Sequence, residues 1–304
     1  MKVIVSIIAS KNDIYNEFKK IWIKAIKEIK QSNLRNMFDF YFVYSSTDSS
    51  VENEYYTDFN DAKSIFDRTT DNSIITKSIL LRSIALFKYI NQKYDITHNS
   101  NGLYILRTNL STFFDFKKLH NWLLDKPKTN FLSGSINGFY NFEHTTLSGT
   151  NMLFSIDIML FLIDNYLQCD LTFMLEDEAI SQLIIKHLSV FLINIKRIDF
   201  IEMEKVVLID HIWPETPHSI IYHKCKMGDT NIFCFRFKTF NRNDDIKKMS
   251  LLECNLQDNN FELNSFINRL SSMYNPKLNI TEEAGEYSIN YSERPFKIIN
   301  LKLS

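Results

Sequence analysis

The stretch KVIVSIIASKNDIYNEFKKIWIKAIKEIKQSN, residues 2–33, decides the fold. It opens with a short apolar run rich in β-branched residues, which is typical of a core strand. After a turn at Lys11, Asn12 and Asp13, apolar residues recur at helical spacing among lysines and predict an amphipathic helix. Its apolar positions are Phe18, Ile21, Trp22, Ala25, Ile26 and Ile29. A second apolar run, residues 37–46, follows, and strand, helix and strand at this spacing predict a sheet covered by helices, the α/β class.

The composition is that of a folded globular chain. Of 304 residues, 45% are hydrophobic and 23% charged, which argues against disorder and against a membrane channel. The 35 Lys and Arg balance 36 Asp and Glu, and the net charge of −1 argues against a chain that wraps nucleic acid. The first apolar run is too short for a signal peptide, and the later apolar stretch 152–167 is broken by Asp157 and Asp164. We therefore expect no nucleic-acid partner, no membrane span and a cytoplasmic location.

The rest of the chain continues the alternation of strands and helices. Helical segments are expected within residues 74–94, 113–127, 146–167 and 171–188 and near 261–274. Strands are expected within residues 102–109, 190–200 and 231–238, and a strand or loop within 130–141. In residues 146–167 a Gly-containing turn leads into the helix. Apart from the strand expected within 231–238, the region from about 204 to 250 is expected to be loop-like. We expect one domain over residues 1–250 and a C-terminal extension, 251–304, that packs on it.

Three successive acids, Glu176, Asp177 and Glu178, form the sharpest local cluster. One interpretation is a helix N-terminus, where the helix dipole favours negative charge. The other is a carboxylate base that projects into a cleft. Adjacent acids repel one another, and this repulsion raises the pKa of one of them toward the working range.

A second cluster is the cationic stretch FRFKTFNR, residues 235–242. On a strand with period two, Arg236 and Lys238 fall on the same face, and Arg242 follows a short turn. Two cations on one face could clamp a diphosphate, with arginine making bidentate bonds to its oxygens. The alternative is a solvated edge strand.

Motifs of other enzyme classes are missing from the sequence. The four cysteines include no C-x-x-C pair, and the seven histidines fit no standard metal-ligand spacing, so we predict no zinc site and reduced thiols. The sequence also contains no G-x-G-x-x-G, no P-loop and no G-x-S-x-G. These absences argue against Rossmann oxidoreductases, P-loop kinases and α/β-hydrolases.

Four pieces in order resemble the β-1,3-galactosyltransferase-like family and related viral or bacterial GT-A glycosyltransferases. They are Lys77-Ser78 in a helix, the strand LYILRTNLSTF, the turn LSGTNMLFSID and the acid run LEDEAI, spread over residues 1 to about 200. The resemblance implies a GT-A fold, with a mixed, mostly parallel central sheet flanked by helices. It also implies a nucleotide-sugar donor, with a UDP-sugar first and a GDP-sugar second, a glycan acceptor, and transfer of a hexose or pentose with inversion.

The same resemblance assigns roles to individual residues. Asp177 matches the catalytic base, with Glu176 and Glu178 as the alternatives, and Ser148 and Gly149 match the turn that shapes the acceptor side. The residues that the resemblance or their charge places near the nucleotide donor are Ser10, Lys11, Asp13, Lys77, Arg107, Thr108, Asn109, Ser111, Arg236, Lys238 and Arg242.

The departure from the family lies at Thr108-Asn109-Leu110-Ser111, where the family has Thr-Asp-x-Asp. Without these carboxylates a hard Mg²⁺ or Mn²⁺ ion loses its preferred ligands. We therefore expect transfer that requires no cofactor, or only weak assistance from Mn²⁺ or Mg²⁺, with fixed cations stabilising the leaving diphosphate instead. The alternative is a catalytically degenerate glycosyltransferase fold that serves as a sugar-binding or assembly subunit. A nucleotidyltransferase would need metal carboxylates as much or more.

Overall fold

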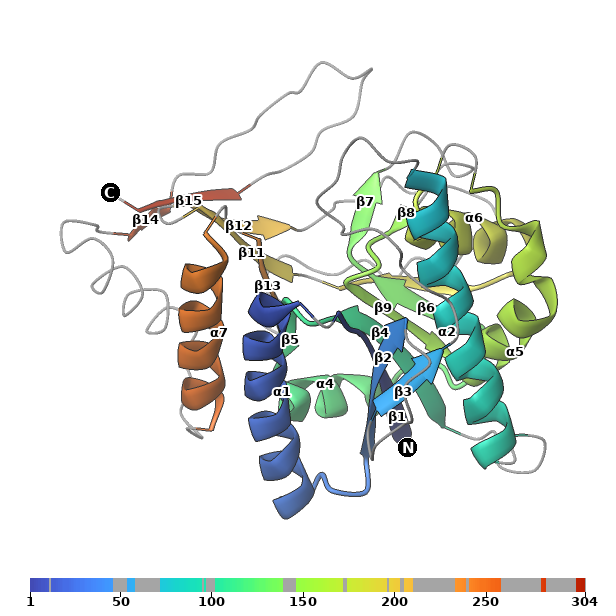
Figure 1. Cartoon of the computed structure of the whole chain (residues 1–304), viewed down its shortest axis with the longest axis horizontal. Helices are drawn as coiled ribbons and strands as arrows, with labels where there is room; N and C mark the ends of the chain where they lie inside the picture. The colour runs from blue at the N-terminus through green and yellow to red at the C-terminus, as the bar shows by residue number, and fades with distance from the viewer. Residues whose placement is uncertain are drawn as a thin grey trace.

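The fold is built on two sheets with helices packed around them (Figure 1). The computed structural model describes residues 1–10, 12–45, 54–57, 72–94, 96, 102–138, 146–171, 174–195, 197–202, 205–209, 233–238, 241–257, 280–282 and 299–303. Within these ranges no helix is both long and apolar enough to cross a membrane.

The described residues form a seven-stranded central sheet in the order β10-β6-β9-β4-β1-β2-β3. Its strands are β1 (Lys2–Ile8), β2 (Phe38–Ser45), β3 (Glu54–Thr57), β4 (Leu103–Asn109), β6 (Phe131–Gly134), β9 (Asn151–Ser155) and β10 (Phe191–Asn194). Strand β9 is antiparallel to both β4 and β6, and the other neighbours pair in parallel. The predicted α/β class with a mixed, mostly parallel sheet is thus confirmed.

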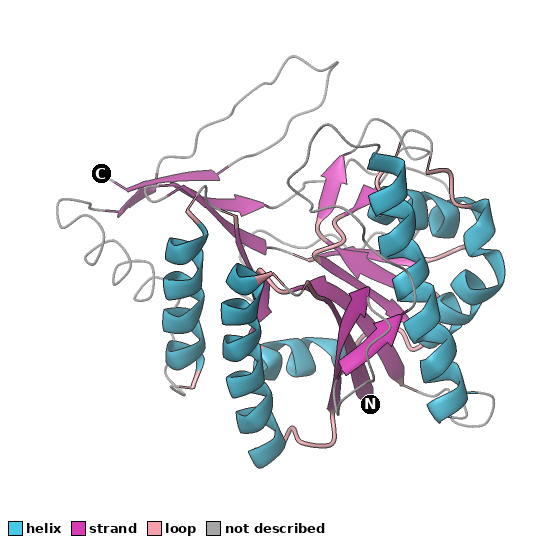
Figure 2. Ribbon diagram, viewed as in Figure 1, coloured by secondary structure: helices cyan, strands magenta, loops and turns pink. Residues whose placement is uncertain are grey.

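Helices cover both faces of this sheet (Figure 2). Helix α1 (Asp13–Gln31) packs on one face, with α4 (Phe116–Leu123) and α7 (Arg242–Leu256) beside it. The opposite face carries α2 (Asn72–Tyr94), α5 (Ile156–Asn165) and α6 (Glu176–His187), and a short 3-10 turn, η2 (Tyr166–Gln168), follows α5. In β1, β2, β4, β6, β9 and β10, alternate residues therefore enter two different cores, as the strand period of two requires.

Helix α1 shows how the local sequence specifies its element. The Asn12 side chain accepts a hydrogen bond from the Ile14 backbone nitrogen at 3.1 Å and caps the helix. The six apolar positions predicted from the spacing are all buried. One of them, Trp22, also donates from Nε1 to the Leu110 carbonyl at 3.1 Å, so that the helix contacts the end of the neighbouring strand β4.

A second sheet lies beside the first and contains six strands among the described residues, in the order β14-β15-β12-β11-β13-β5. These strands are β5 (Thr112–Phe114), β11 (Arg197–Glu202), β12 (Lys205–Ile209), β13 (Cys234–Phe237), β14 (Ile280–Glu282) and β15 (Ile299–Leu303). A small antiparallel pair joins β7 (Ile136–Gly138) to β8 (Thr146–Leu147). Because β5 follows β4 directly, the chain passes from one sheet to the other at the tip of β4.

Several predicted elements need correction. Strand β9 occupies the start of the apolar run that was expected to be a turn and a helix, because a strand buried on both faces lacks polar alternation. Helix α7 and strand β12 lie in the region expected to be loop-like. The single strand expected over residues 190–200 is two strands, β10 and β11, in different sheets.

The C-terminal part of the chain is described only in pieces. The helix predicted near 261–274 lies outside the described residues. Helix α7 runs through residue 250, where a domain boundary was predicted, and β15 pairs with β12.

Candidate active site

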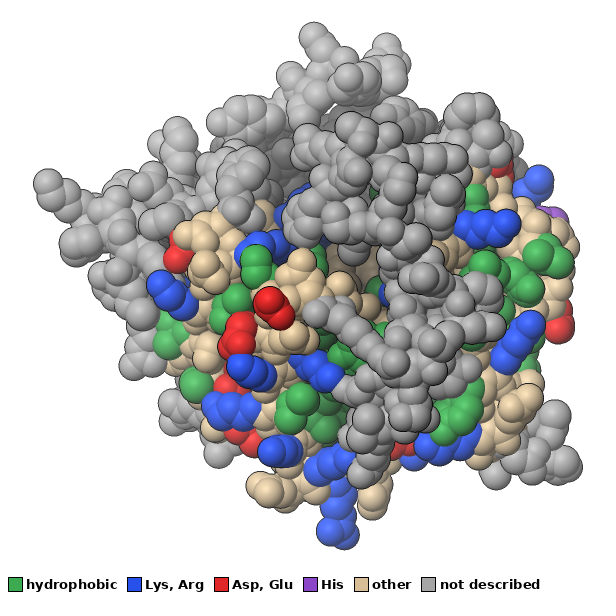
Figure 3. Space-filling view, in the orientation of Figure 1, with side chains coloured by type: hydrophobic (Ala, Val, Ile, Leu, Met, Phe, Trp, Pro, Cys, Tyr) green, Lys and Arg blue, Asp and Glu red, His purple; other side chains and the backbone are tan. Residues whose placement is uncertain are grey.

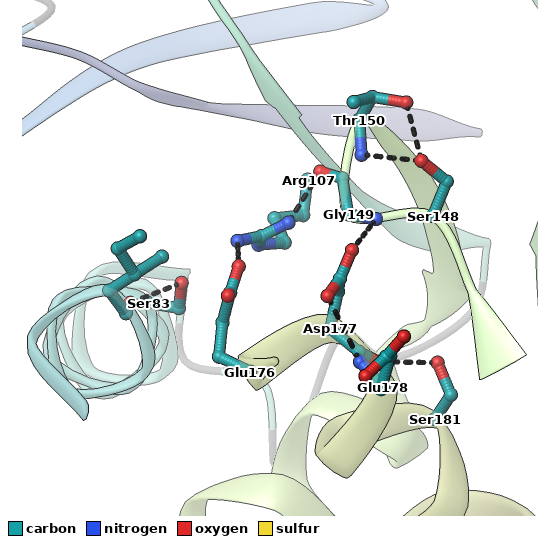
Figure 4. A network of polar contacts seen from close by, with 10 residues as sticks. Ser83, Arg107, Ser148, Gly149, Thr150, Glu176, Asp177, Glu178 and Ser181 are labelled. Atoms are coloured by element: carbon teal, nitrogen blue, oxygen red, sulfur yellow. Dashed lines mark hydrogen bonds and ion pairs between the residues drawn. The ribbon is translucent and has the colours of Figure 1, made fainter. Parts of the chain in front are cut away.

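The centre of the main sheet offers a ligand-binding position by its topology alone. The chain adds β2 and β3 on one side of β1 and then crosses to β4 on its other side. The sheet therefore has a topological switch point between β1 and β4. Open α/β sheets bind ligands beyond the carboxyl ends of their strands at such a switch point. Polar residues from β4, from the turn after β8 and from the start of α6 meet near the carboxyl end of β4 (Figure 4).

Arg107 on β4 joins two of these segments. Its Nη1 donates to the Gly149 carbonyl, and its Nη2 donates to Glu176 Oε1. The side chains of Arg107 and Glu176 are both buried, so the two charges neutralise one another away from water. The buried ion pair ties the central strand to the first turn of α6.

Gly149 links Arg107 to the acid cluster. While its carbonyl accepts from Arg107, its backbone nitrogen donates to Asp177 Oδ2 at 2.6 Å. A Cβ atom at this position would lie 1.9 Å from Arg107 Nη1 and 2.8 Å from Asp177 Cβ. Only glycine leaves room for the backbone to approach both side chains.

The three successive acids have three different environments. Glu176 pairs with Arg107, and Glu178 Oε2 accepts from the Leu175 backbone nitrogen at 3.1 Å, which caps the start of the helix. Half-buried Asp177 accepts one backbone N–H on each oxygen, from Gly149 and, at 3.1 Å, from Glu178. The helix N-terminus interpretation is therefore confirmed. The structure also makes Asp177 the acid that connects the helix to the turn.

Burial is the main cause of the one pKa shift resolved in this cluster. It raises the pKa of Glu176, while the Arg107 charge opposes the shift and the Asp177 charge adds to it. The predicted repulsion between neighbouring acids is present but is a smaller contribution than desolvation.

The turn after β8 is held by further polar contacts. Ser148 Oγ and Thr150 Oγ1 lie 2.8 Å apart, and Thr108 Oγ1 donates to the Thr150 carbonyl at 2.6 Å. Arg197 on β11, also buried, donates to Thr150 Oγ1 at 2.8 Å. Sequence reasoning missed Arg197, because an arginine beside a lysine in an apolar strand gives no sign that it will be buried.

The tip of β4 is a compact turn organised by Asn109. Its Oδ1 accepts from the Ser111 backbone nitrogen at 3.2 Å, from Ser111 Oγ at 3.1 Å and from Thr112 Oγ1 at 3.1 Å. The neutral amide is thus used within the turn. Since Asn109 Oδ1 is already occupied and the tip contributes no carboxylate, these residues do not fit a hard divalent ion. Among the described residues, no three His, Cys, Asp or Glu side chains form a group that could hold a metal.

The cationic strand β13 lies beside this tip. It pairs with β5 so that Arg236 is opposite Thr112, and the Phe237 backbone nitrogen donates to the Ser111 carbonyl at 2.9 Å. Lys238 follows at the end of the strand and is exposed. Strand β13 lies between β11 and β5, so the edge-strand alternative is wrong.

Arg242 has a different position from the other two cations. It begins α7 and donates from Nη1 to the Phe237 carbonyl at 2.8 Å and to Asp245 Oδ2 at 3.0 Å. These contacts attach the start of α7 to the end of β13. The structure therefore places Arg236 and Lys238 beside the tip and Arg242 at the junction of β13 and α7.

The remaining predicted donor residues are spread more widely. Half-buried Ser10 follows β1, Asp13 is exposed in the first turn of α1, and Lys77 is exposed on α2. Lys11 lies outside the described residues. Near Ser10 the structure adds a residue that the sequence analysis missed, buried Arg82 of α2, whose Nη1 lies 3.4 Å from the Ala9 carbonyl.

The surface in the view of Figure 3 carries charges of both signs. On its described part, Lys and Arg side chains lie interspersed with Asp and Glu side chains.

Comparison of the chain with models of protein families finds no match. A search of curated proteins finds no match either.

Proposed function

We propose that this chain is an inverting glycosyltransferase, which moves a hexose or pentose from a nucleotide-sugar donor to a hydroxyl group of a glycan acceptor. The observation that carries the proposal is the fixed carboxylate of Asp177. It is half-buried, bound by the Gly149 amide, and connected through Arg107 to the carboxyl end of the strand at the switch point. The α/β architecture is compatible with a GT-A fold, which the order of the four sequence pieces favours.

In the proposed reaction Asp177 is the general base. It takes the proton from the acceptor hydroxyl as that oxygen attacks the anomeric carbon in line with the departing nucleoside diphosphate. The new bond joins the acceptor oxygen to the anomeric carbon, the bond to the diphosphate oxygen breaks, and the configuration inverts. The proton ends on Asp177, and the bonding electrons leave with the diphosphate.

The departing diphosphate carries negative charge that the site must stabilise. Arg236 and Lys238 lie on the strand that pairs with the residues after the Asn109 turn, so they are the cations that we assign to this task. Because the tip does not fit a divalent ion, no step of the proposed reaction passes through a metal.

The test is a thermal-shift screen against UDP- and GDP-sugars, with Mn²⁺ and with EDTA, followed by transfer assays with the donors that stabilise the protein. Donor binding and transfer that persist in EDTA are expected. Asp177→Asn is expected to keep the thermal shift and lose transfer, whereas Asp164→Asn, an exposed acid on α5, keeps both. Full loss of activity in EDTA with rescue by Mn²⁺ would refute the metal-independent route.

The neutral turn at Asn109 also favours a second candidate, a degenerate glycosyltransferase fold that binds sugars or assembles with other subunits. Loss of the acid pair is what such degeneration would produce. Calorimetric titration with UDP and GDP separates the two candidates, because only the enzyme needs a nucleotide site. Absence of nucleotide binding favours the second.

A further inference from the structure

We propose that Arg107 is a positioning residue, which sets the orientation of the Asp177 carboxylate through the backbone of Gly149. The inference rests on the proposed function, in which Asp177 is the base. It assigns Arg107 a task different from the donor binding that its charge alone suggested.

The geometry places Gly149 between the two side chains. The Arg107 guanidinium holds the carbonyl of the peptide group that follows the Gly149 Cα, and the N–H of the peptide group that precedes it donates to Asp177 Oδ2 at 2.6 Å. With the carbonyl held, rotation of the glycine backbone is restricted and the N–H keeps its direction. The second Asp177 oxygen accepts from Glu178 within its own helix. The carboxylate is thus fixed from two segments that are distant in the sequence.

Burial and pairing argue against a direct contact of Arg107 with the donor. Its side chain is 5% exposed, and both of its Nη atoms donate to protein acceptors, although its buried Nε has no hydrogen-bond partner among the described residues. It also lies on the sheet face covered by α2 and α6, in register with Ser6 of β1. A residue buried in this way acts on a ligand through its neighbours.

The guanidinium is hydrogen-bonded to the neighbouring acid and not to Asp177 itself. Here the guanidinium binds Glu176, the adjacent acid, and reaches Asp177 only through a neutral peptide group. The arrangement therefore supplies orientation while the charge of Arg107 is compensated elsewhere.

Glycine-selective NMR tests the link without any assay of activity. The chain has six glycines, so ¹⁵N-glycine labelling gives a simple amide spectrum. Carbonyl-labelled serine then selects Gly134 and Gly149, the glycines that follow serine, and Gly134→Ala distinguishes them. A short N–H bond to a carboxylate moves the amide proton downfield. We expect the Gly149 signal downfield, and upfield in Asp177→Ala and in Arg107→Met.

Matched variants separate positioning from general damage. Arg107→Lys is expected to move the Gly149 signal less than Arg107→Met does, and it remains informative if the methionine variant fails to fold. Arg82→Lys changes another buried arginine, which contacts the Ala9 carbonyl, and is expected to leave the Gly149 signal in place. A Gly149 signal that stays unmoved in both Arg107 variants would overturn the proposal.

Kinetics supply a second readout with a donor selected by the thermal-shift screen. Arg107→Lys is expected to lower kcat by up to about 100-fold, as a displaced catalytic group does, and to leave KM for the donor close to that of the wild type. A raised KM with normal kcat would make Arg107 a donor-binding residue and overturn the positioning role. If no donor is turned over, the proposed function fails while the NMR experiment still decides whether Arg107 orients Asp177.

Discussion

Arg107 and Glu176 form a buried ion pair between residues 69 positions apart, one on a central strand and the other in the first turn of a helix. Removing one partner leaves the other charge buried, which costs about 3–5 kcal/mol of unfolding free energy. Arg107→Met and Glu176→Met are therefore each expected to be strongly destabilising. The double variant leaves no buried charge unpaired, so its loss of unfolding free energy is expected to lie well below the sum of the two single losses and close to one of them.

Urea unfolding of the two single variants and the double variant measures this interaction as a double-mutant cycle. Additive losses would contradict the pair. The Gly149 carbonyl also loses its donor in both variants that lack Arg107, so the double variant is not expected to reach wild-type stability.

Gly149→Ala is expected to destabilise the fold because the new Cβ would lie 1.9 Å from Arg107 Nη1. Overpacking of this kind costs about 1–3 kcal/mol. Gly134→Ala is the control, since its Cβ would meet its nearest atom, the Asn151 carbonyl oxygen, at 3.3 Å. Chemical denaturation should show a larger loss of unfolding free energy in Gly149→Ala than in Gly134→Ala. A larger loss in Gly134→Ala would show that the surroundings of Gly149 can adjust to a side chain.

Asn109→Ala is expected to loosen the tip of β4, because three donors from Ser111 and Thr112 lose their shared acceptor. The loss of unfolding free energy is expected to be about 1–3 kcal/mol. Asn109→Asp retains an acceptor oxygen at the same position and is expected to keep most of the stability. Equal losses in the two variants, measured by thermal or urea unfolding, would mean that the turn depends on the amide group itself.

Lys238→Met is expected to weaken UDP binding about tenfold or more, since a hydrogen bond to a charged group is worth about 1.5–3 kcal/mol. The exposed Lys27→Met on α1 is the control and should leave the affinity unchanged. Isothermal titration with UDP measures both. An unchanged affinity in Lys238→Met would remove this lysine from the proposed diphosphate site.

Asp115→Asn is expected to flatten the dependence of stability on pH. Asp115 caps α4 by accepting from the Lys118 backbone nitrogen at 3.0 Å, and burial raises the pKa of its carboxyl group above the usual value of about 4. A raised folded-state pKa means that the folded protein binds the proton more tightly. The stability from this residue is therefore present below about pH 4 and is lost as the pH rises through the raised pKa.

Asparagine keeps the cap without the charge, so Asp115→Asn should gain stability relative to wild type as the pH rises from about 4 toward neutrality. Asp115→Ala is the control and should lose about 1 kcal/mol with the cap. Urea unfolding at several pH values measures the difference between variant and wild type. A difference that is independent of pH would contradict the predicted shift.

Local pattern was enough to predict much of the fold. The apolar run at the start of the chain became β1, the helical spacing of six apolar residues became the buried face of α1, and the acids at 176–178 became the first turn of α6. Each of these depends on residues that are close in sequence. Periodicity and capping act over one or two turns, so they can be recognised without the rest of the protein.

Tertiary structure decided the elements and partners that have no local signature. Strand β9 is buried on both faces and looks like the start of a helix, and β13 became interior only because β5 and β11 flank it. The sequence by itself determined that Arg107 is a cation near the end of a strand and that Asp177 belongs to an acid cluster. Only the folded chain determined that Arg107 pairs with Glu176 and that Gly149 stands between Arg107 and Asp177, because such contacts join residues that approach one another only when the sheet assembles.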